Sequence, residues 1–290
     1  MPSLGRQLSF WALAPIISAL LPPIIRKINA LQSLDLASHT IHYRVDGDNG
    51  KKPWLLFCNS LGTDLRMWDP QVDILSSDFR ILRYDRRGHG RSTTPSTPFT
   101  IADLGNDVVA LLDALNIEKT NFCGLSIGGL TGQWLAIHAS QRLHRIVVCA
   151  TAAKIGTMES WTARIEEVCN DGLQPLASAT AERWFSPAFR VSNPAIVDAV
   201  LKSFGDTSED GYVGCCAALA TADLRADLAH IRHPLLAISG DRDPVCPPAD
   251  LQALAVGASF GRHVSLPGRH IINIEAANSF NKVVRSFLLE

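Results

Sequence analysis

The sequence has no excess of charge of either sign. It contains 27 lysines and arginines against 28 aspartates and glutamates, so the formal net charge is -1, and the isoelectric point is near 6.7. Proteins that bind nucleic acid or anionic membranes by electrostatic attraction carry a basic surface, which this balance does not provide. We therefore expect no nucleic-acid partner.

Motifs for metals, disulfides and nucleotide cofactors are also missing. The seven cysteines are odd in number, include no Cys-x-x-Cys pair and mostly stand in apolar runs. This pattern predicts buried free thiols in a reducing compartment, and hence a cytoplasmic protein. We find no glycine-rich loop of the kind that holds phosphates. No metal, nucleotide or flavin cofactor is expected.

Long hydrophobic runs are absent except near the N-terminus. Residues 10–25 carry no charge, but three prolines interrupt the run, and it is shorter than the roughly 20 residues that a membrane span needs. A signal peptide is not indicated, because no convincing cleavage site follows. Residues 1–33 are therefore predicted to form an apolar extension. Three interpretations stay open: residues 1–30 lie on a membrane surface, they dock on the domain, or the start of translation is mis-assigned.

The stretch from Asn121 to Trp134 reads Asn-Phe-Cys-Gly-Leu-Ser-Ile-Gly-Gly-Leu-Thr-Gly-Gln-Trp and contains a Gly-x-Ser-x-Gly motif centred on Ser126. An apolar strand ending at Cys123 must turn sharply here into a helix that starts near Ile127. Such a turn strains the serine backbone and exposes its Oγ, and glycine flanks it because a Cβ atom would collide across the turn. The motif arises easily by chance, so the strand, turn and helix around it decide the interpretation. We predict that Ser126 is a nucleophile.

Strands and helices alternate around this motif. Continuous apolar runs predict buried strands, and period-two alternation predicts an antiparallel edge ribbon. The predicted strands are 40–45, 54–58, 80–84, 120–123, 145–149, 234–239 and 262–266. Helical spacing of apolar residues predicts helices over 101–115 and 273–289, the first with Thr100 and Asp103 as a capping box. The alternation indicates parallel strands with helices on both faces of the sheet.

The segment from 157 to 227 shows helical patterns but no strand pattern. Helices are predicted over 161–169, 176–184, 195–204 and 212–220. An all-helical insertion at this point is expected to be a cap that covers the active site, excludes water from it and shapes the acyl pocket. The predicted organisation is an N-terminal extension at 1–33, a core at 34–150 and 229–290, and a cap at 151–228.

Two turns are predicted to bind an oxyanion. A loop of small residues, beginning Asn59-Ser60-Leu61, follows the first buried strand. In hydrolases with this type of serine turn, one backbone N–H of that loop and the N–H after the nucleophile stabilise the oxyanion. We therefore expect Leu61 and Ile127 to donate these N–H groups. Ser60 and Trp134 are the candidate residues of the substrate pocket.

The acid and the base are predicted from the loops after the last two strands. A Gly-Asp-Arg-Asp-Pro turn contains Asp243, and His270 stands just past the last strand. The order Ser126, Asp243, His270 is the chain order of nucleophile, acid and base in such hydrolases. Asp243 is preferred over Asp241 because it precedes a proline, whose fixed φ stiffens the turn. His89, in an earlier glycine-and-charge turn, is predicted to be structural.

Several stretches carry a resemblance to a known family. They are Cys-Asn-Ser-Leu-Gly-Thr-Asp-Leu-Arg-Met-Trp-Asp-Pro-Gln from Cys58, the turn at 85–92, Gly-Leu-Ser-Ile-Gly-Gly-Leu-Thr-Gly-Gln-Trp-Leu-Ala from Gly124, Ala-Lys-Ile-Gly-Thr from Ala153, and Cys215-Cys216. From about Leu34 onward, the sequence resembles the α/β-hydrolases and is most similar to the bacterial 3-oxoadipate enol-lactonases of aromatic catabolism. The resemblance implies an α/β-hydrolase fold, a mostly parallel eight-stranded sheet flanked by helices, with a helical cap. It also implies 3-oxoadipate enol-lactone as the small-molecule substrate.

Other functions stay open. The family often carries an Arg-Asp pair where this chain has Ala220-Thr221, and this departure favours another hydrolase of the fold, such as an acyl-homoserine lactonase or a short-chain carboxylesterase. A non-catalytic ligand-binding member of the superfamily is the second alternative. Serine at the turn argues against haloalkane dehalogenase and epoxide hydrolase chemistry, which use an aspartate there.

The enol-lactone carries a free carboxylate, which would need a cation under the cap, because burying an unpaired charge is costly. The sequence offers five candidates without choosing among them. They are Lys154, Arg164, Arg183, Arg190 and Arg225.

Overall fold

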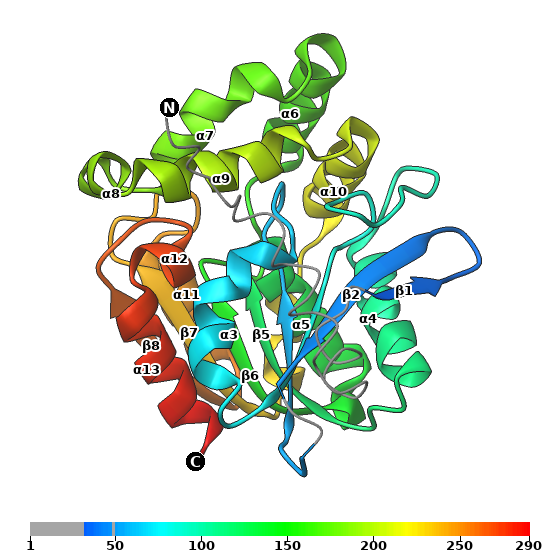
Figure 1. Cartoon of the computed structure of the whole chain (residues 1–290), viewed down its shortest axis with the longest axis vertical. Helices are drawn as coiled ribbons and strands as arrows, with labels where there is room; N and C mark the ends of the chain where they lie inside the picture. Colours follow the sequence, from blue (N-terminus) through cyan, green and yellow to red (C-terminus); the bar gives the residue numbers. More distant parts are fainter. Residues whose placement is uncertain (1–31, 48–49) are drawn as a thin grey trace, which may run out of the picture.

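A single eight-stranded sheet forms the centre of the computed structural model, which describes residues 32–47 and 50–290 (Figure 1). The strand order is β1-β2-β4-β3-β5-β6-β7-β8. The strands are β1 (Gln32–Asp35), β2 (Thr40–Asp46), β3 (Trp54–Cys58), β4 (Arg80–Tyr84), β5 (Thr120–Leu125), β6 (Leu143–Cys149), β7 (Pro234–Gly240) and β8 (Phe260–Leu266). The pairs β1–β2 and β2–β4 are antiparallel, and all other pairs are parallel. The predicted mostly parallel sheet with an antiparallel edge is confirmed.

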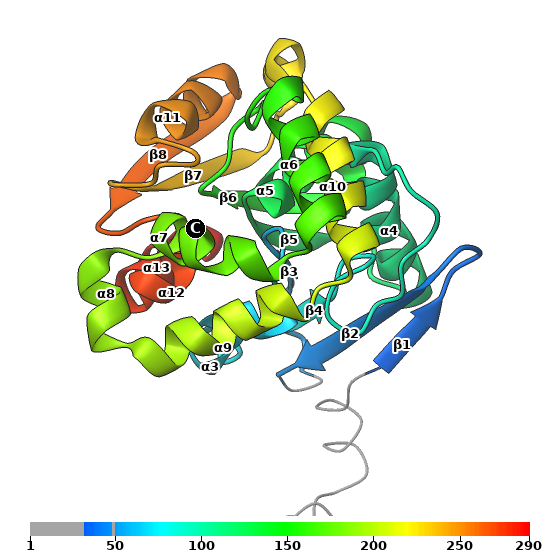
Figure 2. The same cartoon turned by 90° about the horizontal axis from the view of Figure 1, so that it is seen from above.

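Helices cover both faces of this sheet (Figure 2). One face carries α4 (Ile101–Ala114), α5 (Ile127–His138) and α11 (Pro248–Gly257), and the other carries α3 (Asp69–Leu75), α12 (Ile272–Glu275) and α13 (Ala277–Leu288). The predicted capping box at the start of α4 is present: the Asp103 N–H donates to Thr100 Oγ1, and the Thr100 N–H donates to the Asp103 carboxylate.

Five helices lie over the carboxyl ends of the parallel strands (Figures 1 and 2). They are α6 (Met158–Asp171), α7 (Ala177–Trp184), α8 (Pro187–Ser192), α9 (Pro194–Gly205) and α10 (Glu209–Thr221). All five belong to the segment between β6 and β7, where the sequence shows helical patterns only. The short α8 was not predicted, although Pro187 in its first turn and the N-cap Ser186, which accepts from the Phe189 N–H, are typical of a helix start.

The structure differs from the predicted elements at four further places. The single helix predicted over 273–289 is broken at Ala276, whose φ of -115° and ψ of 37° are not helical. The helices α3 and α11 were missed, since both are short and their apolar residues do not form a long periodic pattern. Strand β1 begins at Gln32 and pairs with β2, so the sheet starts two residues before the boundary expected at Leu34.

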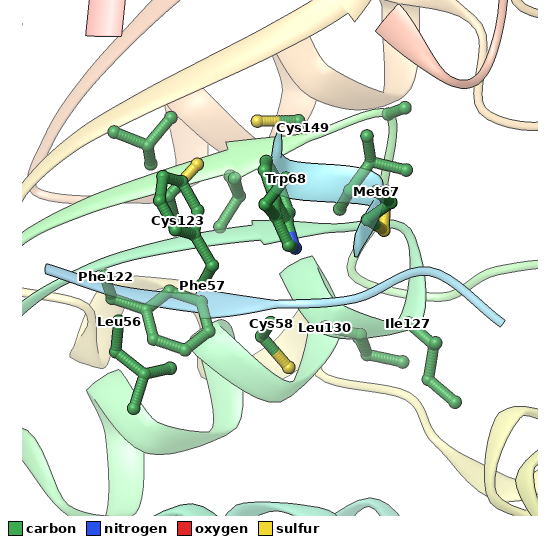
Figure 3. Close-up of a cluster of buried hydrophobic side chains, with 14 of the residues drawn as sticks. Leu56, Phe57, Cys58, Met67, Trp68, Phe122, Cys123, Ile127, Leu130 and Cys149 are labelled. Atoms are coloured by element: carbon green, nitrogen blue, oxygen red, sulfur yellow. The ribbon is translucent and has the colours of Figure 1, made fainter. Parts of the chain in front are cut away.

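Apolar side chains fill the space between the sheet and its helices (Figure 3). Phe57 of β3 stacks on Trp68 with 4.5 Å between the ring centroids, and Cys58, Cys123 and Cys149 are buried in the same cluster. All seven cysteines are free thiols, and six are buried as predicted. The prediction is wrong for Cys169, which is exposed.

Among the residues that the structure describes, no helix combines the length and the apolar character needed to cross a membrane. The apolar run at 10–25, and with it the predicted membrane contact of residues 1–30, lies outside the described residues.

Candidate active site

Loops at the carboxyl edge of the sheet meet beneath the helices of the insertion. The loops after β3, β5, β7 and β8 carry Leu61, Ser126, Asp243 and His270 respectively. Parallel strands place their carboxyl ends at one edge, which is where open α/β sheets bind ligands. A cavity of about 80 Å³ at this edge is lined by Ser60, Leu61, Ser126 and His270 from the core and by residues of α6, α7 and α10.

Ser126 has the strained backbone that its motif predicts. It lies between β5 and α5 with φ 59° and ψ -122°, a region that non-glycine residues seldom adopt. Two hydrogen bonds hold it there: the Ser126 N–H donates to the Cys149 carbonyl at 2.9 Å, and Thr151 Oγ1 donates to the Ser126 carbonyl at 2.7 Å. The side chain of Ser126 faces the cavity.

The two glycines of the motif are required for the close approach of backbone segments. A Cβ atom on Gly124 would lie 2.4 Å from the carbonyl oxygen of Gly128, and one on Gly128 would lie 2.3 Å from that of Cys58. Distances this short are repulsive, and the obstructing atoms belong to backbone that cannot rotate away. The predicted collision across the turn is therefore present in the structure.

Asp243 and His270 form a buried hydrogen-bonded pair. The Nδ1 of His270 lies 2.8 Å from Oδ2 of Asp243, and the other carboxylate oxygen accepts from the backbone N–H groups of Val245 and Cys246. These contacts fix the carboxylate, assign the imidazole proton to Nδ1 and leave Nε2 as an acceptor. Among the described residues no hydrogen bond joins Ser126 Oγ to His270, although both line one cavity; catalytic contacts of this kind often close only around substrate.

The two residues predicted to bind an oxyanion through their backbone N–H groups are Leu61 and Ile127. Ile127 is the first residue of α5, and the first N–H groups of a helix have no partner within it. Leu61 lines the cavity from the loop after β3. Both residues stay the predicted donors for the oxyanion that would form when Ser126 attacks a carbonyl.

His89 supports the loop that carries Leu61. Its Nε2 accepts the N–H of Gly62 at 3.0 Å, so the proton is on Nδ1, which donates to the Arg87 carbonyl at 3.2 Å. Burial, assisted by the nearby positive charge of Arg86, lowers the pKa of His89 to about 3. The side chain has a structural role, as the sequence predicts, and burial keeps it neutral.

Trp134 is not at the cavity. Its indole lies 4.8 Å, centroid to centroid, from the ring of His138 in the same helix, and it packs against Gly105 of α4. The helical period explains the error, because Trp134 stands two turns beyond the start of α5, on the side that faces α4. Of the two predicted pocket residues, only Ser60 lines the cavity.

Two arginines from the helices above the sheet complete the cavity. Arg164 of α6 and Arg183 of α7 both line it. Arg164 Nη1 is buried and has no hydrogen-bond partner among the described residues, and its Nε lies 3.5 Å from Glu167. Burial and then the charge of Arg164 lower the pKa of Arg183, whose side chain donates to Thr180 Oγ1. The site therefore holds two cations with spare donors.

The other three candidate cations are paired with carboxylates and do not line the cavity. Lys154 and Arg225 both contact Asp223, and Arg190 lies 3.9 Å from Glu182. The sequence did not identify Trp161 and Tyr212, which also line the cavity. Periodicity shows which face of a helix is apolar, but not which residue points at a catalytic group.

The described part of the chain contains no group of three or more His, Cys, Asp or Glu side chains that could hold a metal ion.

Comparison with known proteins places this geometry in a family. The sequence profile of the alpha/beta hydrolase fold matches residues 53–191. The chain is 42% identical over 266 residues to 3-oxoadipate enol-lactonase 2 of Acinetobacter baylyi, covering 92% of this chain and 98% of the relative. It belongs to the α/β-hydrolase family. A second relative, 3-oxoadipate enol-lactonase 1 of the same organism, is 39% identical to this hydrolase, with 90% and 98% of the two chains covered.

A solved structure supports the same assignment. The crystal structure of the enol-lactonase from Burkholderia xenovorans LB400 superposes on this hydrolase with a TM-score of 0.88 at 43% identity, covering 89% of this chain and 100% of the other. The similarity extends over nearly the whole length of each relative, so this α/β-hydrolase is an enzyme of the ester- and lactone-hydrolysing type.

Proposed function

We propose that this α/β-hydrolase opens 3-oxoadipate enol-lactone to 3-oxoadipate through an acyl-enzyme on Ser126. The observation that carries the proposal is the presence of Arg164 and Arg183 in the same cavity as Ser126 and His270. A serine nucleophile explains ester cleavage in general. The two cations select a substrate that carries its own negative charge.

The chemistry follows from the contacts of the site. His270 Nε2 takes the proton of Ser126 Oγ as the oxygen attacks the lactone carbonyl, and the N–H groups of Leu61 and Ile127 stabilise the oxyanion. Collapse of the tetrahedral intermediate breaks the ring C–O bond, and the leaving enol oxygen takes the proton from His270. Asp243 keeps the imidazole oriented and stabilises its cation. A water, deprotonated by His270, then releases the acyl group.

The arginines supply what the substrate carboxylate needs. An ionised carboxylate under the helices would be costly without a partner. Arg164 offers a buried Nη1 without an acceptor among the described residues, and Arg183 has no carboxylate within 4 Å in the same part of the chain. A bound carboxylate would accept these hydrogen bonds and reduce the repulsion between the two guanidinium groups.

The departure at Ala220-Thr221 does not leave the cavity without a cation. Thr221 ends α10, and its hydroxyl donates to carbonyl groups of its own helix. The two arginines come from α6 and α7 instead.

Residues 151–228 are proposed to act as a cap. Their helices contribute Trp161, Arg164 and Arg183 to the walls of the cavity, and Ser126 and His270 beneath them are only 6% and 2% exposed. Exclusion of water would strengthen the electrostatic interactions of the site.

The proposal is tested by comparing the anionic enol-lactone with its neutral methyl ester. The variants are Arg164→Met and Arg183→Met, and Arg190→Met is the matched control because its side chain does not line the cavity. Loss of a hydrogen bond to a charged group costs about 1.5–3 kcal/mol, so KM for the anion should rise about 10- to 150-fold in either cavity variant. KM for the methyl ester should change little.

A preference of the wild type for neutral lactones, together with an unchanged KM in both cavity variants, would contradict the enol-lactonase assignment. It would leave a general lactonase or carboxylesterase of the same fold.

A further inference from the structure

Arg86 is a buried cation without a carboxylate partner among the described residues. It follows β4 and is 1% exposed, and within the described part of the chain no Asp or Glu oxygen lies within 4 Å of its guanidinium group. Its neighbour Arg87, by contrast, pairs with Asp107 at 2.7 Å. Burying a charge without a partner of opposite charge is costly. The hydrogen bonds that Arg86 makes therefore indicate its role.

Those hydrogen bonds go to the loop that carries the oxyanion donor. Arg86 Nη2 donates to the carbonyl oxygen of Asn59 at 2.5 Å and Nη1 to that of Ser60 at 3.3 Å. Arg86 Nη2 also lies 3.7 Å from Cys58 Sγ. Three consecutive residues at the end of β3 are thus held by one side chain.

The contact with Ser60 determines where the Leu61 N–H points. The Ser60 carbonyl and the Leu61 N–H belong to the same planar peptide unit, in which the two bonds point in opposite directions. Thr63 Oγ1 donates to the same carbonyl at 2.9 Å. With the carbonyl held on the side of Arg86 and Thr63, the N–H is directed away from them.

Leu61 and Ser126 line the same cavity. We infer that Arg86 is a positioning residue that holds the Ser60–Leu61 peptide so that its N–H stabilises the oxyanion formed at Ser126. The inference rests on the proposed serine-hydrolase mechanism. Arg86 does not touch the substrate; its positive charge polarises the peptide through the Ser60 carbonyl and makes the Leu61 N–H a stronger donor.

The test separates turnover from binding with p-nitrophenyl acetate, a neutral ester that does not need the arginines of the cavity. Loss of one oxyanion donor lowers kcat by about 10²- to 10³-fold. We expect Arg86→Met to lower kcat by about 10²-fold and to change KM less than about threefold. Affinity for a trifluoromethyl ketone, whose hemiketal oxygen on Ser126 occupies the oxyanion position, should fall by a similar factor.

Arg87→Met is the matched control, because it removes a buried ion pair next in the chain and should leave kcat of the folded protein unchanged. Thr63→Val removes the second hydrogen bond to the Ser60 carbonyl, together with a contact to Met67 Sδ at 3.0 Å, and should lower kcat about 10-fold. If Arg86→Met does not fold, the kcat of Thr63→Val tests the inference alone. Wild-type kcat in Thr63→Val and Arg86→Met, or a loss of kcat with unchanged affinity for the ketone, would overturn the inference. Failure of the proposed function appears separately, as a wild type that does not turn over the enol-lactone.

Discussion

At the scale of single residues, the two aspartates of the turn after β7 hold different partners. Asp243 is buried and bonds His270, whereas Asp241 is largely exposed and accepts from the N–H of Gly268 and from Arg242. Asp243→Asn should lower kcat by about 10⁴-fold, because the amide stabilises the wrong imidazole tautomer. Asp241→Asn should reduce kcat far less. Steady-state kinetics on any ester substrate measure both, and a larger loss at Asp241 would reverse the assignment.

The neutral His89 predicts a pH dependence of stability. Its folded-state pKa of about 3 lies below the ordinary value of 6.5, so below pH 6.5 the unfolded chain binds a proton that the folded protein does not. Stability is therefore lost as the pH falls from about 6.5 toward 3, at up to about 1.4 kcal/mol per pH unit. The variant His89→Gln, which cannot titrate, should lose roughly 2–3 kcal/mol less than the wild type between pH 7 and pH 4.5.

Urea unfolding at the two pH values measures this difference. Burial raises the pKa of Asp85 to about 6, which favours the folded state as the pH falls through that range. This contribution is common to both proteins and cancels in the comparison. Parallel loss of stability in wild type and variant would show that His89 is not held neutral.

The residues of the proposed triad could be predicted because each stands in a loop directly after a strand. Once the strands were assigned, their parallel order brought Ser126, Asp243 and His270 to one edge. The selection of Arg164 and Arg183 from five cations was not possible from the sequence. It depends on how α6 and α7 are rotated, because that rotation brings their arginines to the cavity of Ser126.

At the scale of elements, the packing of α5 against β3 depends on Gly128. A Cβ atom at this position would lie 2.3 Å from the Cys58 carbonyl oxygen and 2.6 Å from that of Asn59. Gly128→Ala should therefore push the helix from the strand, destabilise the protein by at least about 1–3 kcal/mol and reduce ester hydrolysis, because the Ser126 turn and the Leu61 loop move apart.

Gly257→Ala is a suitable control for this prediction. Its Cβ would meet atoms of the Leu228 side chain, the nearest at 2.7 Å, and this side chain can change rotamer. Thermal unfolding and activity should both show a much smaller effect at Gly257. Equal effects of the two substitutions would mean that the close approach at Gly128 is not needed for the turn.

Elements of the sheet were predicted better than helices of the insertion. Continuous apolar runs locate β3 and β4 to the residue, since both are buried and bounded by polar turns. The break at Ala276 could not be predicted, because no glycine marks this helix end, whereas the start of α8 does have a signal in Ser186 and Pro187. Those ends are set by tertiary contacts: the Ser186 N–H at the start of α8 donates to Glu275, the last residue of α12.

At the scale of the whole molecule, the order of strands explains why residues far apart in the chain form one site. The proposed nucleophile follows β5 near the middle of the sheet, and the proposed acid and base follow β7 and β8 at one end of it. The insertion between β6 and β7 then covers the edge where all three meet (Figure 1). Fold class and catalytic order therefore follow from the sequence, whereas the substrate depends on side chains of the insertion.

Hydrolysis of 3-oxoadipate enol-lactone by Ser126 and His270 can be measured directly. The measurement is kcat/KM for this lactone, and the loss of its ultraviolet absorbance reports the reaction. It is made on the wild type, Ser126→Ala, His270→Ala and the double variant. The wild type should reach at least about 10⁴ M⁻¹s⁻¹. Each single variant should lose several orders of magnitude with its fold intact, and the double variant should be little worse than either, since the residues act as one unit. A wild type no faster than the uncatalysed reaction, or a Ser126→Ala variant that keeps substantial activity, would contradict this mechanism.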